Sequence, residues 1–213
     1  MRARLLRPAL TLGVLGLLAT AGLAGAALAP KPVCNLVTDE KGDGTGFLFT
    51  DADYLPNDPQ LDLVSGDIAT NGKMITAVIR TAELALTDSN APTGRIFYAN
   101  FTVGEATLWL AAELDRAGAG SFAAGFTETR RTALGAATGV VDVGKKEIRI
   151  TAPMSIFAEK AKIKGGVKIL DLNLLAQRFL GDRAVVGVTP SADAATGGKT
   201  YVAGAPSCVT VGK

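Results

Sequence analysis

The chain has 213 residues, of which 48% are hydrophobic and 25 are glycine, so it is long and apolar enough for one globular domain rather than a disordered chain. It contains no histidine, which removes the usual general base of serine and cysteine hydrolases, the imidazole ligands of haem and copper, and the common zinc enzymes. Its formal net charge is only +2, which argues against nucleic acid as a partner.

The N-terminal segment has the pattern of a secretory signal peptide. Three arginines within the first seven residues precede an apolar run over residues 9–29, and Ala24-Gly25-Ala26 offers small residues for cleavage. We therefore expect residues 1–26 to be removed and residues 27–213 to form one secreted domain without further contact to the membrane. Because the apolar run is close to the length of a bilayer span, a retained anchor is the alternative.

The opening of the predicted domain, up to Pro59, is rich in aspartate, glycine and proline and predicts mostly loop, with one short strand at 46–49. Within it, Asp39 and Asp43 are two of the carboxylates of a glycine-rich loop. Calcium prefers six to eight oxygen ligands, several of which a flexible loop can supply, so these two aspartates are candidate calcium ligands. The spacing differs from that of an EF-hand. Asp-Gly turns closed by side-chain to backbone hydrogen bonds explain the same residues without a metal.

Strand patterns then recur at intervals of about ten residues, separated by turn signals. Asn71-Gly72 between two apolar runs indicates a tight hairpin. After Pro153, residues 154–160 predict one or two helical turns, whereas 167–180 fits either a strand or a helix. The pattern predicts an all-β fold, an antiparallel, jelly-roll-like β-sandwich with one short helix and long loops. The expected strands cover 61–64, 67–68, 74–80, 95–102, 106–111, 121–127, 137–141, 147–151, 200–203 and 209–211.

Two aromatic residues are candidates for a ligand-binding surface. Side chains alternate between the faces of a strand, so Phe97 and Tyr98 must point to opposite sides and one of them lies on the outer face. Tyr98 and Trp109 are the pair that would form a sugar-stacking platform. Core packing is the alternative for Trp109.

The two cysteines lie near opposite ends of the predicted domain. In an oxidising compartment, Cys34 and Cys208 are expected to pair and to close a loop over nearly the whole domain. Free thiols are the alternative. With no histidine, two cysteines are too few for a structural zinc site.

Charge is distributed unevenly along the chain. Residues 39–67 contain eight acidic residues and one lysine, whereas 145–168 contain seven basic residues and two glutamates. Two solvated faces of opposite sign explain this asymmetry, and a cation site at the acidic end is the sharper hypothesis.

Three stretches carry a resemblance to a known group of domains: residues 38–43 (TDEKGD), residues 61–68 (LDLVSGDI), and residues 138–154 with their Glu147-Ile148-Arg149-Ile150 pattern. Together they resemble secreted bacterial β-sandwich modules, found alone or appended to subtilisin-like proteases, which are similar to DOMON-like domains and family 9 carbohydrate-binding modules. The resemblance implies a non-catalytic extracellular sandwich, with calcium held near Asp39 and Asp43. The chain lacks the haem-ligand histidine of cytochrome-type DOMON domains and the tryptophan pair of a sugar sandwich.

These observations predict a secreted binding or interaction module rather than an enzyme. Its expected partner is an envelope or extracellular polysaccharide, or a surface protein, and calcium is the only cofactor considered. A structural or accessory protein that acts by protein contact is the alternative, and a hydrolase that uses carboxylates alone is a more remote one. The sequence leaves the oligomeric state open.

Overall fold

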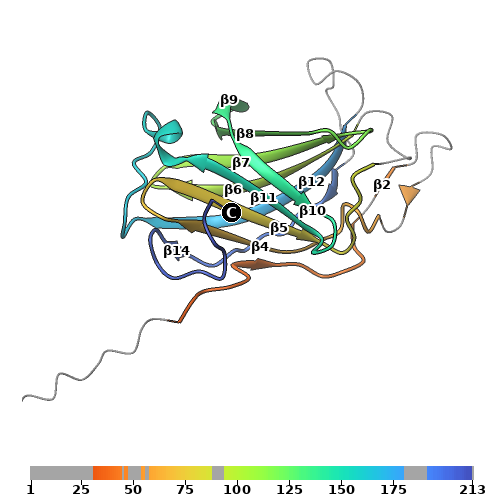
Figure 1. Ribbon diagram of the computed structural model, residues 1–213, viewed down its shortest axis with the longest axis horizontal. Coiled ribbons are helices and arrows are strands. Elements are labelled where there is room, and N and C mark those ends of the chain that lie inside the picture. Colours follow the sequence, from red (N-terminus) through yellow and green to blue (C-terminus); the bar gives the residue numbers. More distant parts are fainter. Residues whose placement is uncertain are drawn as a thin grey trace, which may run out of the picture.

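The computed structural model describes residues 31–44, 46–47, 54–55, 58–87, 94–179 and 191–212. Within these residues the chain folds into two antiparallel sheets packed face to face (Figure 1), which confirms the predicted all-β sandwich. The predicted signal peptide lies outside the described residues. In the described part of the chain, no helix is long and apolar enough to span a bilayer. The elements are β1 (Val37–Thr38), β2 (Gly46–Phe47), β3 (Tyr54–Leu55), β4 (Leu63–Thr70), β5 (Met74–Thr81), β6 (Gly94–Val103), β7 (Ala106–Asp115), β8 (Gly120–Thr127), β9 (Arg131–Ala136), β10 (Thr138–Asp142), β11 (Glu147–Pro153), the 3₁₀ helix η1 (Met154–Phe157), β12 (Lys168–Phe179), β13 (Ser191–Asp193) and β14 (Tyr201–Val202).

The two sheets are joined by a short connection along one side of the sandwich and not along the other. One sheet has the order β1-β4-β5-β11-β10 and the other β13-β12-β6-β7-β8-β9, with β14 beside β12. On one side the chain passes from β9 to β10, and so from one sheet to the other, through Ala137 alone. The opposite side presents the edge strands β1 and β13. The N-terminal loops and the segment after β13 meet at that open side.

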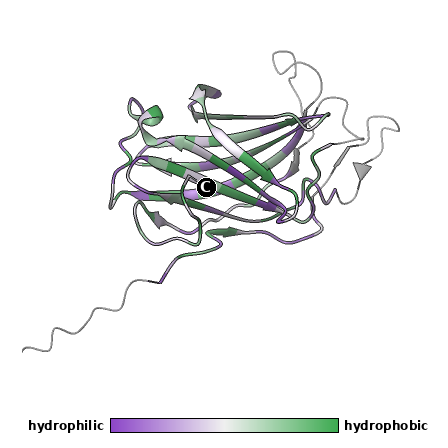
Figure 2. Ribbon diagram, viewed as in Figure 1, coloured by the Kyte–Doolittle hydropathy of each residue, from purple (hydrophilic) through white to green (hydrophobic). Residues whose placement is uncertain are grey.

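The core lies between the sheets and follows from alternation along each strand. In β5, Ile75, Ala77 and Ile79 are fully buried, and the same parity buries the inner residues of β6, β7, β11 and β12. Phe157 of η1 meets Phe101 of β6 edge to face at 6.0 Å and plugs one end of the sandwich. Figure 2 shows hydrophobic colours within the strands and hydrophilic colours toward their ends and turns.

Local signals predicted several elements well. The Asn71-Gly72 turn joins β4 and β5, and the Asn71 side chain accepts hydrogen bonds from the backbone N–H groups of Lys73 and Met74. The ambiguous stretch 167–180 is strand β12, and one turn of 3₁₀ helix follows Pro153 as expected.

Two local predictions were wrong or incomplete. The expected strand at 209–211 does not form, because this segment crosses the outer face of the five-stranded sheet instead of lying along an edge. There Val209 packs on Ala69 and Val78, and the backbone N–H of Gly212 donates to Thr76 Oγ1. Strand β9 was missed, since its small residues give no clear alternation.

The disulfide Cys34–Cys208 forms as predicted and links the first and last described segments. Beside it, Val33 exchanges backbone hydrogen bonds with Pro206 and Cys208, at 3.2 and 3.3 Å. The N- and C-terminal segments are therefore fastened to each other and to the outer face of the five-stranded sheet. A disulfide in this position is consistent with folding in an oxidising compartment.

Candidate functional site

Three aspartates from two distant parts of the chain meet at the open side of the sandwich. Asp39 directly follows β1, Asp43 lies four residues further in the same loop, and Asp193 is the last residue of β13. β1 and β13 are edge strands of different sheets, so this acidic cluster spans the seam between the two sheets.

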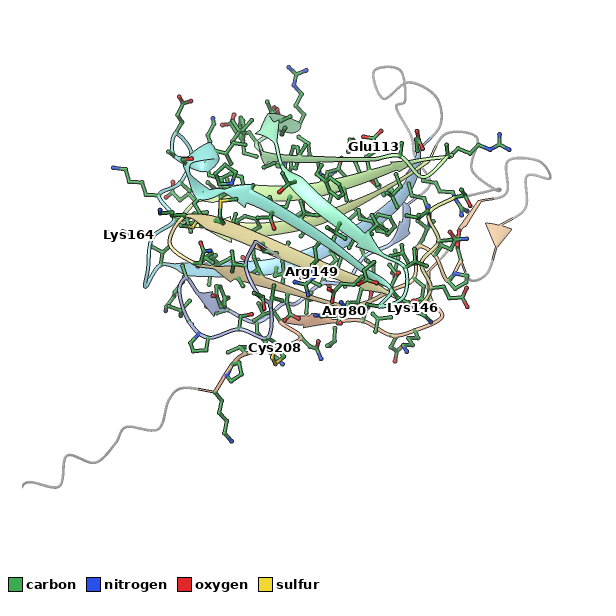
Figure 3. All side chains as sticks on the ribbon, viewed as in Figure 1. Arg80, Glu113, Lys146, Arg149, Lys164 and Cys208 are labelled. Carbon is green, nitrogen blue, oxygen red and sulfur yellow. A yellow bond between two sulfur atoms is a disulfide. The ribbon has the colours of Figure 1, made fainter. Side chains whose placement is uncertain are left out.

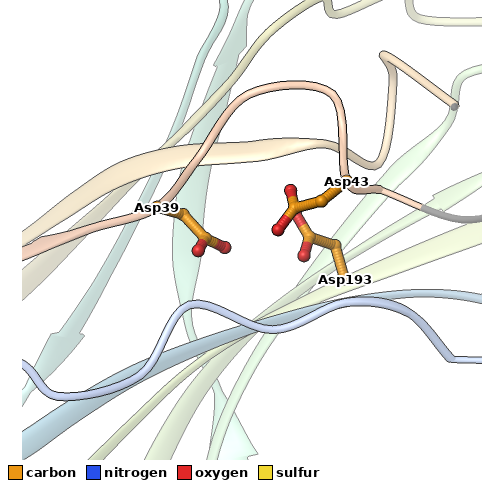
Figure 4. Close-up of side chains that lie close together, drawn as sticks. All are labelled: Asp39, Asp43 and Asp193. Carbon is orange, nitrogen blue, oxygen red and sulfur yellow. The ribbon is translucent and has the colours of Figure 1, made fainter.

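The three carboxylates of the acidic cluster point toward one another (Figure 4), and one oxygen from each lies within 4.8 Å of the others. Asp193 is buried, Asp39 is half-buried and Asp43 is exposed. Backbone contacts hold two of them in place. Asp193 Oδ2 accepts a hydrogen bond from the N–H of Leu63 at 2.6 Å, and the N–H of Asp39 donates to the carbonyl of Val64 at 3.0 Å.

A fourth carboxylate, Asp62, lies behind the acidic loop. It is 1% exposed, and its Oδ2 accepts a hydrogen bond from the N–H of Gly42 at 2.8 Å. Asp62 Oδ1 and Asp39 Oδ2 are buried and accept no hydrogen bond from the described residues. Buried polar atoms are normally satisfied, so two unsatisfied carboxylate oxygens at one edge leave the site short of a positive or donating partner.

Burial raises the pKa of two carboxylates in the acidic cluster. It raises the pKa of Asp193 to about 6; the charges of Asp39 and Asp43 add to this rise, and hydrogen bonds from Leu63 and Ala194 oppose it. The pKa of Asp39 is also raised, first by burial and then by the charge of Asp43. Both shifts mean that burial, and to a smaller extent the neighbouring charges, destabilises the ionised form of these two side chains.

The sign of the resulting pH dependence follows directly. An aspartate in an unfolded chain titrates near 3.9, whereas Asp193 titrates at about 6 in the folded protein, so between these values the folded state holds more protons. The stabilisation from this proton is fully present below about 3.9 and is lost as the pH rises through about 6. A bound cation would offset that loss at neutral pH.

The donor set suits a hard divalent cation. Three carboxylates, two from the N-terminal loop and one from β13, each offer an oxygen of the hard type that calcium prefers, and carbonyl or water oxygens would have to complete the coordination. The geometry brings together the predicted pair Asp39 and Asp43. Asp193 was missed, because a single aspartate in a stretch of small residues carries no local signal.

The second predicted site, Tyr98 and Trp109, lies on the outer face of the seven-stranded sheet. The two rings meet edge to face at 5.8 Å, and the guanidinium of Arg131 lies 4.2 Å from the centre of the Tyr98 ring. With Ala133, these three residues line a hollow of about 290 Å³.

Within this hollow the two aromatic rings differ in access. Trp109 is 5% exposed and its indole N–H donates to the carbonyl of Phe126, so it forms the floor. Tyr98 is half-buried and Arg131 is exposed, so these two side chains offer the accessible surface. Phe97 points into the core, as alternation predicted.

Comparisons with protein-family models, with curated proteins and with solved structures gave no match to this chain.

Proposed function

We propose that this chain is an exported, non-catalytic β-sandwich module whose acidic cluster binds one calcium ion. The observation that carries the proposal is the convergence of Asp39, Asp43 and Asp193 across the seam between the sheets, with one oxygen from each within 4.8 Å. The signal-like N-terminal segment and the disulfide support export. A kinship to DOMON-like or family 9 carbohydrate-binding-like modules, which the sequence suggested, would place calcium at the same edge.

Calcium at this position would act as a clamp. The ion would offset the cost of ionising Asp39 and Asp193, whose pKa is raised by burial and by neighbouring charge, and it would join the N-terminal loop to the edge of the opposite sheet. Extracellular modules bind calcium with dissociation constants of roughly 10⁻⁴–10⁻³ M, which suits an exposed site of few ligands.

A thermal melt of residues 27–213 in calcium and in excess EDTA tests this proposal. With free calcium at about a hundred times its Kd, the folded state gains about 2.7 kcal/mol, which raises Tm by roughly 5–10 °C. Asp43→Asn removes one exposed carboxylate and should abolish this rise.

The same variant also separates a metal site from a set of turns. Because Asp43 repels its neighbours in the absence of a cation, D43N should melt at or above the wild-type temperature in EDTA and below it in calcium. The matched control Glu105→Gln removes an exposed carboxylate from the turn between β6 and β7 and should keep the full calcium response. Equal midpoints of the wild type in calcium and EDTA would refute the site.

Glycan binding at the hollow beneath Arg131 is the second candidate function. It is favoured by the exposed guanidinium of Arg131, which lies over the half-buried Tyr98 ring at the hollow and would pair with an acidic substituent of a glycan.

Affinity electrophoresis through gels containing bacterial envelope polysaccharides tests this second candidate. Tyr98→Ala and Arg131→Ala should each weaken retention about tenfold, the effect expected for a central binding residue. Arg116→Ala, at the exposed turn between β7 and β8, serves as the control. If all three variants migrate like the wild type, the hollow is not a glycan site.

A further inference from the structure

A groove of about 520 Å³ opens at one end of the sandwich and shares no lining residue with either site above. Its walls come from the turn between β4 and β5, the end of β11, η1 and the segment that follows η1. A groove of this size falls within the range of sites for small organic ligands, roughly 300–1,000 Å³. The lining residues are Gly72, Lys73, Met74, Pro153, Met154, Ser155, Ala158, Ala161, Lys162 and Ile163.

The floor of the groove is apolar. Met154 and Ile163 are 7% and 8% exposed, and Met74 is half-buried beside them. Methionine side chains are unbranched and polarisable, so two of them in one floor adapt readily to a flexible hydrocarbon.

The charged groups of the groove are all of one sign. Lys73 and Lys162 are exposed and line it, whereas the exposed Glu159 of the same segment is not among the lining residues. Neither lysine forms an ion pair within the described part of the chain. The nearby Lys160 differs, since its ammonium pairs with Glu128 at 3.0 Å and covers the Phe126 ring.

The groove lies at the opposite end of the strands from the acidic cluster. β4 begins at Leu63, whose N–H binds Asp193, and runs to the turn that carries Lys73. In Figure 3, Lys164, which follows the groove wall, lies at one end of the sandwich. Lys146, in the turn between β10 and β11, lies at the other end. Occupancy of the groove is therefore independent of calcium at the acidic cluster.

From these contacts we propose that the groove binds a single-chain amphiphile with a phosphate headgroup. The apolar floor takes the first carbons of the chain, and the two ammonium groups of Lys73 and Lys162 face the phosphate. A phosphate monoester carries about −1.5 to −2 charges at neutral pH, which two lysines balance without any other counter-charge. An uncharged amphiphile would leave both ammonium groups without a partner.

Isothermal titration of the protein with dodecyl phosphate, below its micelle concentration and in EDTA, tests this proposal. We expect one site per chain. Three compounds should each bind at least about tenfold more weakly. Inorganic phosphate lacks the apolar chain, dodecyl maltoside lacks the charge, and dodecanoate lacks the second negative charge.

Variants locate the site. Lys73→Gln with Lys162→Gln should weaken dodecyl phosphate at least about tenfold, since charge-assisted contacts are lost. Ala158→Glu places a carboxylate in the exposed wall and should abolish binding without disturbing the core. Lys199→Gln removes one exposed lysine charge outside the groove and should bind as the wild type does.

Each other outcome overturns the proposal. Equal affinity for dodecyl maltoside would show that the lysines do not contribute to binding, and equal affinity for inorganic phosphate would show the same for the apolar floor. Equal affinity for dodecanoate would show that the groove does not select a phosphate headgroup. Unchanged affinity of the double lysine variant, with A158E binding normally, places any bound amphiphile elsewhere. Because the titration is done in EDTA, its failure does not bear on the calcium site.

Discussion

Replacing both Cys34 and Cys208 with alanine is expected to lower the free energy of unfolding by about 5 kcal/mol at most. The disulfide spans 174 residues, and the loop-entropy relation gives about this value for a loop of that length. Both cysteines are exposed, so the substitutions leave no cavity in the core. The loss therefore acts through the unfolded chain, which becomes free to expand.

Urea unfolding of the oxidised wild type and of C34A/C208A measures this effect. Besides a lower midpoint, the variant should show a larger m-value, because an unfolded chain without the cross-link exposes more surface. A difference below about 1 kcal/mol would contradict this account and would show that the unfolded chain stays compact without the cross-link.

Removal of Asp58 should be nearly as costly. Asp58 forms an ion pair with Arg178, and the two residues are 4% and 1% exposed. Arg178 on β12 lies directly across from Arg95 on β6, which is fully buried and donates to Gln60 Oε1 and to the carbonyl of Ala85 at 2.6 Å each. Asp58→Ala would leave two neighbouring buried arginines without this carboxylate, a loss of about 3–5 kcal/mol.

The paired substitution distinguishes charge from packing. In Asp58→Ala with Arg178→Met, the arginine that pairs with Asp58 is removed together with the carboxylate, so the double variant should recover part of the stability lost in D58A. Urea midpoints of D58A, R178M and the double variant complete the cycle. A double variant that loses as much stability as the two single variants together would show that Asp58 and Arg178 stabilise the sandwich through separate contacts and not through their ion pair.

The acidic cluster shows why candidate sites are only partly visible in a sequence. Asp39 and Asp43 stand out because they are neighbours in a glycine-rich loop. Asp193 joins them because its carboxylate accepts a hydrogen bond from the N–H of Leu63, which lies 130 positions earlier in the chain. No local sequence pattern encodes a contact between residues so far apart. Trp109 shows the same limit, since only the packing of β7 against its neighbours decides that its indole forms the floor of the hollow.

The sequence by itself determined what depends on neighbouring residues. Alternation along residues 147–151 predicted one strand, Asn71-Gly72 between two apolar runs predicted the hairpin that leads into the strand at 74–80, and the absence of histidine excluded several chemistries. Export and the pairing of two cysteines also followed as expectations. The structure describes that pairing, whereas export belongs to the proposed function.

The tertiary structure decided what depends on residues far apart in the chain. It settled strand order, the bulge near Leu63 that adjusts which residues face inward, and the path of residues 209–212 across a sheet face instead of along an edge. It also brought Lys73 and Lys162 to one groove and three aspartates to one seam. The physical reason is that sheets are held by non-local hydrogen bonds and burial, whose partners a local pattern does not specify.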